Sequence, residues 1–421
     1  MSPEEAVADA HRREWAMVLA ATVRVTRDLD LAEECVQDAY TAALREWARD
    51  GVPARPGAWL TTAARHNALD LFRRANTLRS KLHLLVEPAN EESELAPPDE
   101  PLASPDDPLR LIFLCCHPAL ALEAQVALTL RLVCGVATPD VASAFLVSES
   151  TMAARITRAK KKIVAARIPF RLPAAAELPD RLDAALTVVH LLFSTGHTAP
   201  SGVDLTRVDL MARALELARL LADLMPDEPE VRGLLALLVA SHARRATRVG
   251  ADGRLLLLSE QDRSAWDRAA IMAADELVVG ALRAGRPGRF TLEAAIATLH
   301  AIAPSYDDTD WPQILVLYTE LLAVWPSPVV ALNRAVAMSM VDGPAAALAV
   351  VEVLEADGRL AGYRYLFAVK ADLLRGLEQD ARPAYEAALA LTDNAAERAF
   401  LERRLAEISV GGSPVPRSRP Y

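Results

Sequence analysis

Aromatic residues make up only 5% of this 421-residue chain, although 52% of its residues are hydrophobic. Ala and Leu supply most of that hydrophobic content, and both residues have a high helix propensity. Strand patterns nearly vanish after residue 180. The length allows two to four domains with substantial cores, and the composition predicts an all-α protein.

The sequence has no apolar run of about 18 residues, no signal-peptide pattern and no lipidation motif. We therefore expect a cytoplasmic protein without membrane contacts. Its four cysteines are Cys35, Cys115, Cys116 and Cys134, and they form no CxxC pair. Because zinc sites need paired ligands at set spacings, we expect no metal and a packing role for the thiols.

Motifs of catalysis are missing as well. The chain contains no phosphate-binding GxxxxGKS/T loop, no GxSxG elbow and no HExxH pair, so we expect no enzyme activity and no cofactor. Single histidines are scattered through the second part of the chain, at positions 190, 197, 242 and 300. Since they lack the spacing of metal ligands, structural or surface roles are expected for them.

The net charge of −10 hides an uneven distribution. Residues 1–172 contain 21 Lys and Arg against 23 Asp and Glu, and eight of these acids crowd into residues 87–108. The rest of this N-terminal part therefore carries a net charge of +6, whereas residues 173–421 carry −8. The basic N-terminal part and the acidic remainder suggest that only the N-terminal part contacts phosphates.

Residues 138–163 show the pattern of two helices joined by a tight turn. Thr138 and Pro139 mark the start of the first helix, because proline is tolerated at an early helical position. Ser148 is a candidate N-cap for the second helix, which is basic. From residue 150 to residue 176 the chain has seven Lys or Arg and no acid. This is the layout of a DNA-reading helix-turn-helix.

The second helix of this motif has two faces at helical spacing. The apolar face, which can pack inward, consists of Met152, Ile156, Ala159 and Ile163. We predict DNA contacts for the polar face beside it and for the lysines that follow, namely Ser150, Thr151, Arg155, Arg158, Lys160, Lys161 and Lys162. The alternative interpretation is a solvated amphipathic helix without a ligand.

Composition divides the N-terminal part into two modules and a linker. In the first module, residues 1–86, the segment 5–84 predicts three or four helices, of which those over 31–47 and 58–74 are the clearest. Residues 87–108 contain six prolines, eight acids and no base, which is typical of an extended or disordered linker. The second module, with the helix-turn-helix, is expected over 109–172.

The remaining chain predicts helical segments that alternate with Pro/Gly turns. Residues 333–355 and 370–391 each read as a helix, a short polar turn and an Ala-rich helix. Such pairs resemble degenerate tetratricopeptide (TPR) units. We therefore predict a TPR-like helical domain over 173–410 and a disordered tail over 411–421.

Two segments of the N-terminal part resemble the extracytoplasmic-function (ECF) sigma factors of RNA polymerase. Residues 29–74, with LDLAEECVQDAYTAAL followed by PGAWLTTAARHNALDLFRR, resemble their region 2. Residues 123–163 resemble their region 4. With HLLFSTGHTAPSG (190–202) and SEQDRSAWDR (259–268), the chain resembles the ECF subgroup that carries a long C-terminal TPR-like extension. This resemblance covers nearly the whole sequence.

The resemblance implies that the protein brings core RNA polymerase to promoter DNA. The helix over 31–47 would dock on the clamp helices of the largest subunit through Glu34, Gln37 and Asp38, while region 4 would meet the flap. The helix over 58–74 would bind the minus-ten element, and its candidate residues are Arg65, Asn67, Arg73 and Arg74. The basic helix of region 4 would bind the minus-thirty-five element.

The resemblance also implies that the acidic extension regulates the sigma modules. It would contact regions 2 and 4, the polymerase or a protein regulator. Two other functions stay open on the sequence. A helix-turn-helix repressor or activator with a helical sensor domain would bind duplex DNA without polymerase, and a helical-repeat scaffold would show no DNA affinity.

Overall fold

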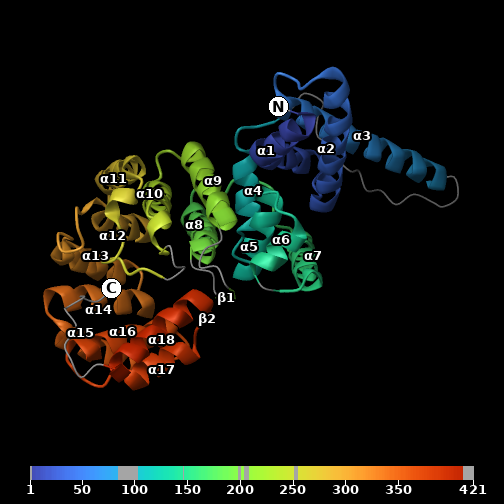
Figure 1. The fold of residues 1–421 in the computed structure, drawn as a ribbon. Coiled ribbons are helices and arrows are strands. Elements are labelled where there is room, and N and C mark those ends of the chain that lie inside the picture. Colours follow the sequence, from blue (N-terminus) through green and yellow to red (C-terminus); the bar gives the residue numbers. More distant parts are fainter. Residues whose placement is uncertain are drawn as a thin grey trace. The chain divides into compact units, whose positions relative to one another are not determined.

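A computed structural model describes residues 2–83, 103–145, 147–197, 201–202, 208–250 and 255–410. Helices dominate these residues, and the strands among them are two of two residues each, so the predicted all-α fold is confirmed. The chain divides into two compact units, residues 1–189 and 190–421 (Figure 1). We call them the N-terminal and the C-terminal unit. The division falls within helix α8 (Leu178–His197).

Three helices form the first bundle of the N-terminal unit: α1 (Pro3–Thr26), α2 (Leu29–Asp50) and α3 (Pro56–His83). Each of the three packs against the other two. Asp28 begins α2, because its carboxylate accepts hydrogen bonds from two backbone N–H groups of the first turn. The predicted helices over 31–47 and 58–74 are thus confirmed, and both are longer than the sequence indicated.

The helix-turn-helix bundle follows. It contains α4 (Asp107–Cys115), α5 (Leu122–Leu128), a π-helical turn (Thr129–Val133), α6 (Thr138–Ala144) and α7 (Glu149–Ala165). Ser148 caps α7, since its hydroxyl accepts a hydrogen bond from the Thr151 backbone N–H at 3.2 Å. The predicted apolar face of α7 is buried, so both the cap and the inward face are confirmed.

Most of the predicted linker, and the predicted tail, lie outside the described residues. The linker prediction extends too far at its end, because Asp107 and Pro108 belong to α4. Asp107 is fully buried and forms ion pairs with Arg24 at 3.5 Å and Arg110 at 3.2 Å. Asp107, which the sequence pattern places in an acidic linker, is therefore buried, and its ion pairs connect α4 to α1.

The cysteines of the N-terminal unit have the packing role expected of them. None of the four, all of which the structure describes, forms a disulfide, and three of them are buried. Burial raises the pKa of the Cys35 and Cys116 thiols to about 11, so both are protonated at neutral pH. Protonated, buried thiols are poor nucleophiles and poor metal ligands.

The C-terminal unit is a series of helices in which each packs against its neighbour in the chain. Its helices after α8 are α9 (Val208–Leu224), α10 (Pro229–Ala243), α11 (Arg268–Arg283), α12 (Arg289–Ile302), α13 (Trp311–Val324), α14 (Pro328–Val341), α15 (Pro344–Asp357), α16 (Arg364–Gly376), α17 (Arg382–Ala390) and α18 (Ala395–Val410). The two predicted helix pairs are confirmed as α14–α15 and α16–α17. Two short strands, β1 (Ser201–Gly202) and β2 (Asp393–Asn394), pair in parallel.

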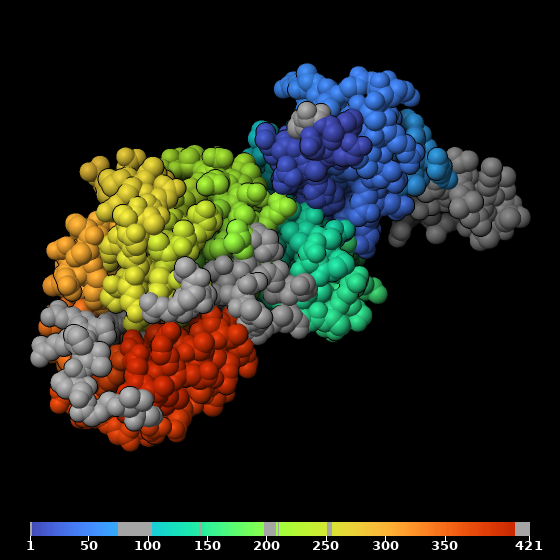
Figure 2. Space-filling view, viewed as in Figure 1, coloured from blue at the N-terminus to red at the C-terminus, as the bar shows by residue number. Residues whose placement is uncertain are grey.

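Small and aliphatic side chains fill the cores of this unit, as the low aromatic content predicts. One core cluster between α10, α11 and α12 consists of alanines and one valine. In the space-filling view, side chains of successive helices close the gaps seen between the ribbons (Figure 2). Among the described residues, no helix combines the length and the apolar character needed to cross a bilayer.

Candidate nucleic-acid interface

The polar face of α7 is open to a ligand. Ser150, Thr151 and Arg158 are exposed, and Arg155 is half-buried beside them. Lys161 and Lys162 are exposed near the end of the helix. Because the buried Met152 and Ile156 fix the helix from the other side, these polar side chains project from a rigid support.

Lys160 differs from the two lysines that follow it. Its side chain is only 11% exposed, and its ammonium group forms an ion pair with Asp30 of α2 at 2.6 Å and another with Glu33. Burial by itself would lower the pKa of Lys160, but the two carboxylates outweigh it and raise that pKa. A phosphate contact of Lys160 stays a prediction, and in this structure its ammonium group is paired with Asp30 and Glu33.

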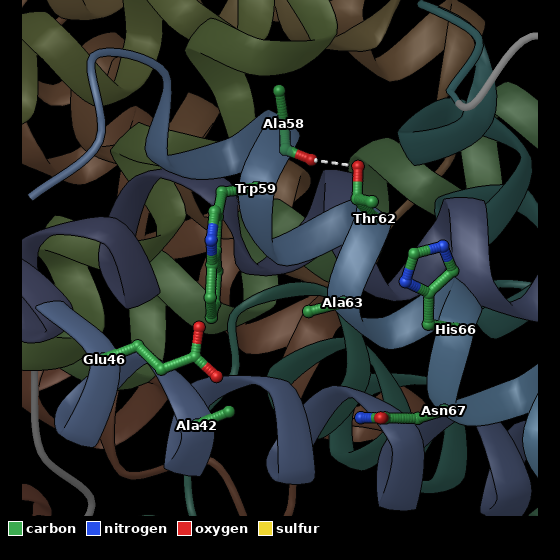
Figure 3. A pocket seen from close by; sticks show the side chains of 8 residues that line it. All are labelled: Ala42, Glu46, Ala58, Trp59, Thr62, Ala63, His66 and Asn67. Atoms are coloured by element: carbon green, nitrogen blue, oxygen red, sulfur yellow. Dashed lines mark hydrogen bonds between the residues drawn. The ribbon is translucent and has the colours of Figure 1, made fainter. Parts of the chain in front are cut away.

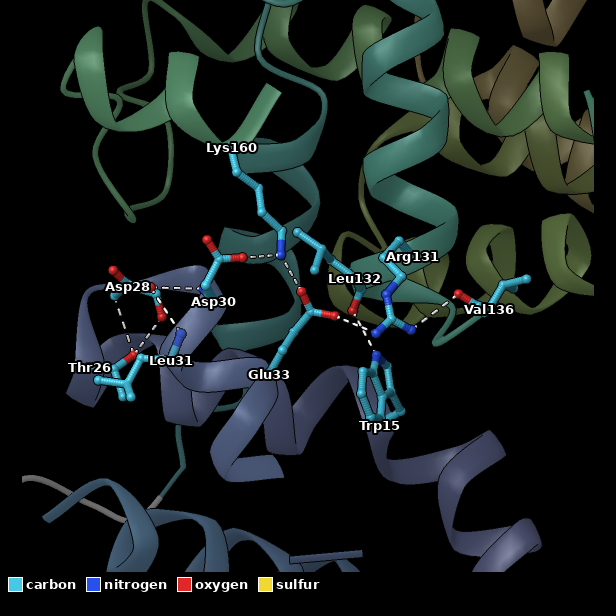
Figure 4. Close-up of polar contacts among 10 residues, drawn as sticks. All are labelled: Trp15, Thr26, Asp28, Asp30, Leu31, Glu33, Arg131, Leu132, Val136 and Lys160. Atoms are coloured by element: carbon cyan, nitrogen blue, oxygen red, sulfur yellow. Dashed lines mark hydrogen bonds and ion pairs between the residues drawn. The ribbon is translucent and has the colours of Figure 1, made fainter. Parts of the chain in front are cut away.

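Glu33 joins the two bundles of the N-terminal unit (Figure 4). Its second carboxylate oxygen lies 2.9 Å from the Arg131 guanidinium, which belongs to the π-helical turn. Side chains of Glu33 and Arg131 are 9% and 18% exposed. One carboxylate of α2 therefore holds two cations of the helix-turn-helix bundle in a nearly dry contact. We call this contact the Glu33 clasp.

A tryptophan and a glycine complete the same contact. The Trp15 indole N–H donates a hydrogen bond to the Leu132 carbonyl at 2.9 Å, and this carbonyl belongs to the π-helical turn. Gly135 follows with a φ of +66°, and a Cβ atom there would lie 2.8 Å from the His11 ring. Both the backbone conformation and the close approach therefore require glycine at this position.

The outer face of α2 carries the residues expected to bind polymerase. Glu34, Gln37 and Asp38 are all exposed, while Ala32, Val36 and the rest of the inner face are buried. Glu33 and Glu34 are thus adjacent in sequence but have opposite environments. The predicted polymerase-binding residues lie together on one accessible helical surface.

The residues expected at the minus-ten element are all on α3 but differ in their environments. Asn67 is half-buried, and its amide N–H donates to the Cys35 carbonyl at 3.1 Å. Arg73 forms an exposed ion pair with Asp70 at 2.9 Å. Arg65 is half-buried and Arg74 is exposed. The structure thus brings the four residues onto one helix, with the Asn67 amide partly committed to α2.

An open pocket of about 520 Å³ lies between α2 and the first half of α3 (Figure 3). It is lined by Ala42, Glu46, Ala58, Trp59, Thr62, Ala63, His66 and Asn67. The Trp59 ring is half-buried and meets the Trp47 ring edge-on, with the ring centres 5.6 Å apart. The pocket therefore offers one aromatic wall together with polar groups, which suits a flat, partly polar ligand.

Sequence reasoning missed Glu33, Arg131 and Trp15. Glu33 has a signal in the sequence, because it shares helical spacing with Val36 and Tyr40 on the apolar face of α2. An acid on a buried face needs a partner, and that requirement predicts an ion pair. Its partner Lys160 lies 127 residues away, so the sequence pattern gives no indication of which cation it is.

Family models match three segments of the chain. Residues 11–77 match sigma-70 region 2, residues 110–163 match sigma-70 region 4, and residues 181–282 match a family of unknown function, DUF6596. No solved structure matches the chain. These segments include α2, α3 and α7, the helices that carry every candidate residue named above.

One relative matches nearly the full length of the chain. The uncharacterized protein R00370 of Rhizobium meliloti is 43% identical to this chain over 391 residues, which is 92% of each protein. The chain therefore belongs to the same family as this protein, one of sigma-70 type, with the regions 2 and 4 of an ECF-like sigma factor followed by a helical C-terminal extension.

Proposed function

We propose that the protein is a sigma factor that directs core RNA polymerase to promoters with a minus-ten and a minus-thirty-five element. The observation that carries this proposal is the capped basic helix α7, whose Thr151 and Arg158 are exposed on a rigid support. Matches to sigma-70 regions 2 and 4 support the same conclusion. Sigma factors act without chemistry of their own, so no cofactor is proposed, and the site of action is the cytoplasm.

Each module would have its own ligand. The exposed face of α2, with Glu34, Gln37 and Asp38, would bind the clamp helices of the largest subunit, and region 4 would bind the flap. Helix α3 would contact the minus-ten strand, with one unstacked base in the pocket beside Trp59. Helix α7 would enter the major groove of the minus-thirty-five element.

Binding both elements at once requires the Glu33 clasp to open. The two elements are about 25 base pairs apart, which is about 85 Å at 3.4 Å per pair. Helices α2 and α7 are joined by ion pairs in this structure, so neither can move that far with the clasp closed. A linker of about 20 residues, at about 3 Å per extended residue, allows a separation of about 60 Å between its ends, and the bundles add the rest through helices about 30 Å long.

The proposal is tested by measuring whether promoter binding requires core polymerase. Purified protein should bind a promoter fragment tightly only in the presence of core polymerase, and run-off transcription with core should start at defined sites. A conventional repressor or activator would instead bind the same fragment equally well without core. A helical-repeat scaffold would show no DNA affinity at moderate salt under either condition, and either result would contradict the proposal.

We also propose that the C-terminal extension, with its TPR-like helix pairs, regulates the sigma modules. Helical-repeat surfaces commonly bind proteins. The position for a truncation follows from the structure. Leu182, Ala185 and Leu186 of α8 are buried and Arg181 donates to the Phe113 carbonyl, so the chain should stop after Val189 rather than before α8.

The truncated protein should differ from the full chain in promoter activity by about fivefold or more, which is the lower end of typical coupling between sites. Activity would be measured from a reporter in cells and by run-off transcription with equal amounts of each protein. A matched control would end at residue 410 and remove only the predicted tail. Equal activity of all three proteins would contradict a regulatory role.

A further inference from the structure

The pocket between α2 and α3 combines a flat aromatic wall with polar groups (Figure 3). The wall is the Trp59 ring. The polar side chains that line the same pocket are Glu46 of α2 and Thr62, His66 and Asn67 of α3. A flat group that stacks on this ring therefore meets polar side chains at its edge.

Hydrogen bonds within the protein leave the pocket rich in acceptors. The Thr62 hydroxyl donates its hydrogen to the Ala58 carbonyl at 2.8 Å, so its oxygen can only accept a further bond. The Asn67 amide nitrogen donates to the Cys35 carbonyl at 3.1 Å. This bond fixes the orientation of the amide and leaves its oxygen and one hydrogen for a ligand.

Glu46 adds the strongest acceptor of the pocket. It is exposed, and no described residue forms an ion pair or a hydrogen bond with its carboxylate. Arg49, three residues further along α2, pairs with Asp50 at 2.7 Å instead. In Figure 3 the Glu46 carboxylate lies beside the Trp59 ring, and the Asn67 amide points toward it from the other side of the pocket. An ionised carboxylate only accepts hydrogen bonds, and its two oxygens can accept from two neighbouring donors.

The negative charge of Glu46 is unfavourable beside DNA unless the carboxylate accepts hydrogen bonds from a base. Phosphates repel this charge, whereas they attract the arginines of α3. Amino groups of bases are the partners that carboxylates use in protein–DNA contacts. The chemistry of the pocket therefore favours a base with several donors on its edge.

The four bases differ in the donors on the edge that an unstacked base exposes. Guanine has two adjacent donor atoms there, N1 and the N2 amino group, followed by the acceptor O6. Adenine and cytosine have one amino group next to an acceptor, and thymine has one N–H between two acceptors. Only guanine therefore offers one donor atom to each oxygen of a carboxylate.

We propose that this pocket selects guanine in one strand of the opened minus-ten element, and that Glu46 determines this specificity. The inference rests on the proposed function and adds the identity of the base to it. The guanine ring stacks on Trp59, and its N1 and N2 groups donate to the Glu46 carboxylate. Its O6 accepts a hydrogen bond from His66 or from the remaining hydrogen of the Asn67 amide.

Binding of the holoenzyme, which is the protein together with core polymerase, to promoter fragments with one unpaired minus-ten strand tests the proposal. Each position of that strand carries each of the four bases in turn, and the two strands are tested separately. At one position guanine should bind about tenfold more tightly than any other base, as expected of one good bidentate contact. Hypoxanthine, which is guanine without the N2 amino group, should lose most of this preference.

Glu46→Gln should abolish the preference for guanine at that position, because the amide replaces one acceptor oxygen by a donor. Asp50→Asn is the matched control. It removes a charge one turn further along the chain, where the carboxylate pairs with Arg49 and does not line the pocket. Any general effect of charge on DNA binding appears in both variants, but only Glu46→Gln should change the ratio between the bases.

Substitutions of Trp59 test the stacking. Trp59→Ala should weaken binding by about fivefold or more for all four bases at that position, because stacking does not depend on base identity. Trp59→Phe keeps an aromatic ring beside Trp47 and should bind nearly as tightly as wild type. Unchanged binding by Trp59→Ala would show that no base occupies the pocket, and the proposal would be wrong.

The proposal is also overturned if wild type shows no preference for guanine at any position, or if Glu46→Gln keeps that preference. Weaker association of Glu46→Gln with core polymerase, at an unchanged ratio between the bases, would assign Glu46 to the polymerase interface instead. In each of these cases the wild-type holoenzyme still binds the promoter, so the proposed function stands. A protein that binds no fragment even with core polymerase contradicts both.

Discussion

Replacing Glu33 by alanine should lower the free energy of unfolding of the N-terminal unit by about 3 kcal/mol, the size expected when one member of a buried ion-pair network is removed. Lys160 and Arg131 would lose the carboxylate that they share, and both side chains are mostly buried. Hydrogen exchange of peptides from α1, α2 and α7 under increasing urea would measure this loss for the N-terminal unit by itself.

Glu34→Ala provides the matched control for Glu33→Ala. The two residues are neighbours on α2, yet Glu34 is exposed, so its replacement should change the stability by less than about 0.5 kcal/mol. Equal effects of the two substitutions would show that the clasp contributes nothing. Gly135→Ala should destabilise the same contact by a different route, because the added methyl group would press on the His11 ring.

A double-mutant cycle would assign the effect to the pair itself. Lys160→Met combined with Glu33→Ala should cost less than the sum of the single substitutions, because neither partner is then left with an unpaired charge. The pKa of Lys160 is raised above its ordinary value, so the ion pair contributes fully below that value and is lost only as the pH rises through the raised pKa. The coupling should therefore be constant between pH 6 and pH 9.

Local sequence patterns correctly predicted the start of α7 and its buried face. Helical spacing placed Met152 and Ile156 on the buried face of α7, and residue type placed the cap at Ser148, as the structure has them. These features depend on residues within one or two turns of each other. Periodicity within one helix is therefore enough to predict them.

The prediction for the three consecutive lysines near the end of α7 did not separate the buried one from the exposed ones. Treating Lys160, Lys161 and Lys162 as one group ignored their spacing, although Lys160 follows Ile156 by one turn and precedes Ile163 by three residues. The helical period thus indicated that Lys160 faces inward. Its partners Asp30 and Glu33 belong to another bundle, and only the fold brings them together.

The surroundings of the histidines in the C-terminal unit could not be predicted for a similar reason. His197, His242 and His300 were each assigned structural or surface roles because none has a ligand spacing along the sequence. The fold of the C-terminal unit brings His197 and His300, from α8 and α12, to the same arginine, Arg244. A contact between the ends of separate helices leaves no pattern within one segment, so the sequence cannot show which residues share it.

Substitutions on the exposed face of α7 should change promoter recognition. If Arg158 reads a base edge, Arg158→Ala should reduce the discrimination between the promoter and a fragment with a changed minus-thirty-five element by about 1–3 kcal/mol, or roughly 5- to 150-fold. The same should hold for Arg155→Ala. Lys161→Ala should instead weaken binding to all sequences and lower the salt slope by about 0.9, the value for one lost phosphate contact.

Competition binding of the holoenzyme to both fragments, between 50 and 200 mM salt, would separate these effects. Lys160→Ala is the informative comparison with Lys161→Ala, because the two side chains are adjacent but only Lys161 is exposed. While the clasp is closed, Lys160→Ala leaves the salt slope unchanged. Opening the clasp on the promoter would free the Lys160 ammonium for a phosphate, so Lys160→Ala should then lower the slope as much as Lys161→Ala does. An unchanged slope for Lys160→Ala would show that the clasp stays closed in the bound complex, and this would contradict simultaneous binding of both elements.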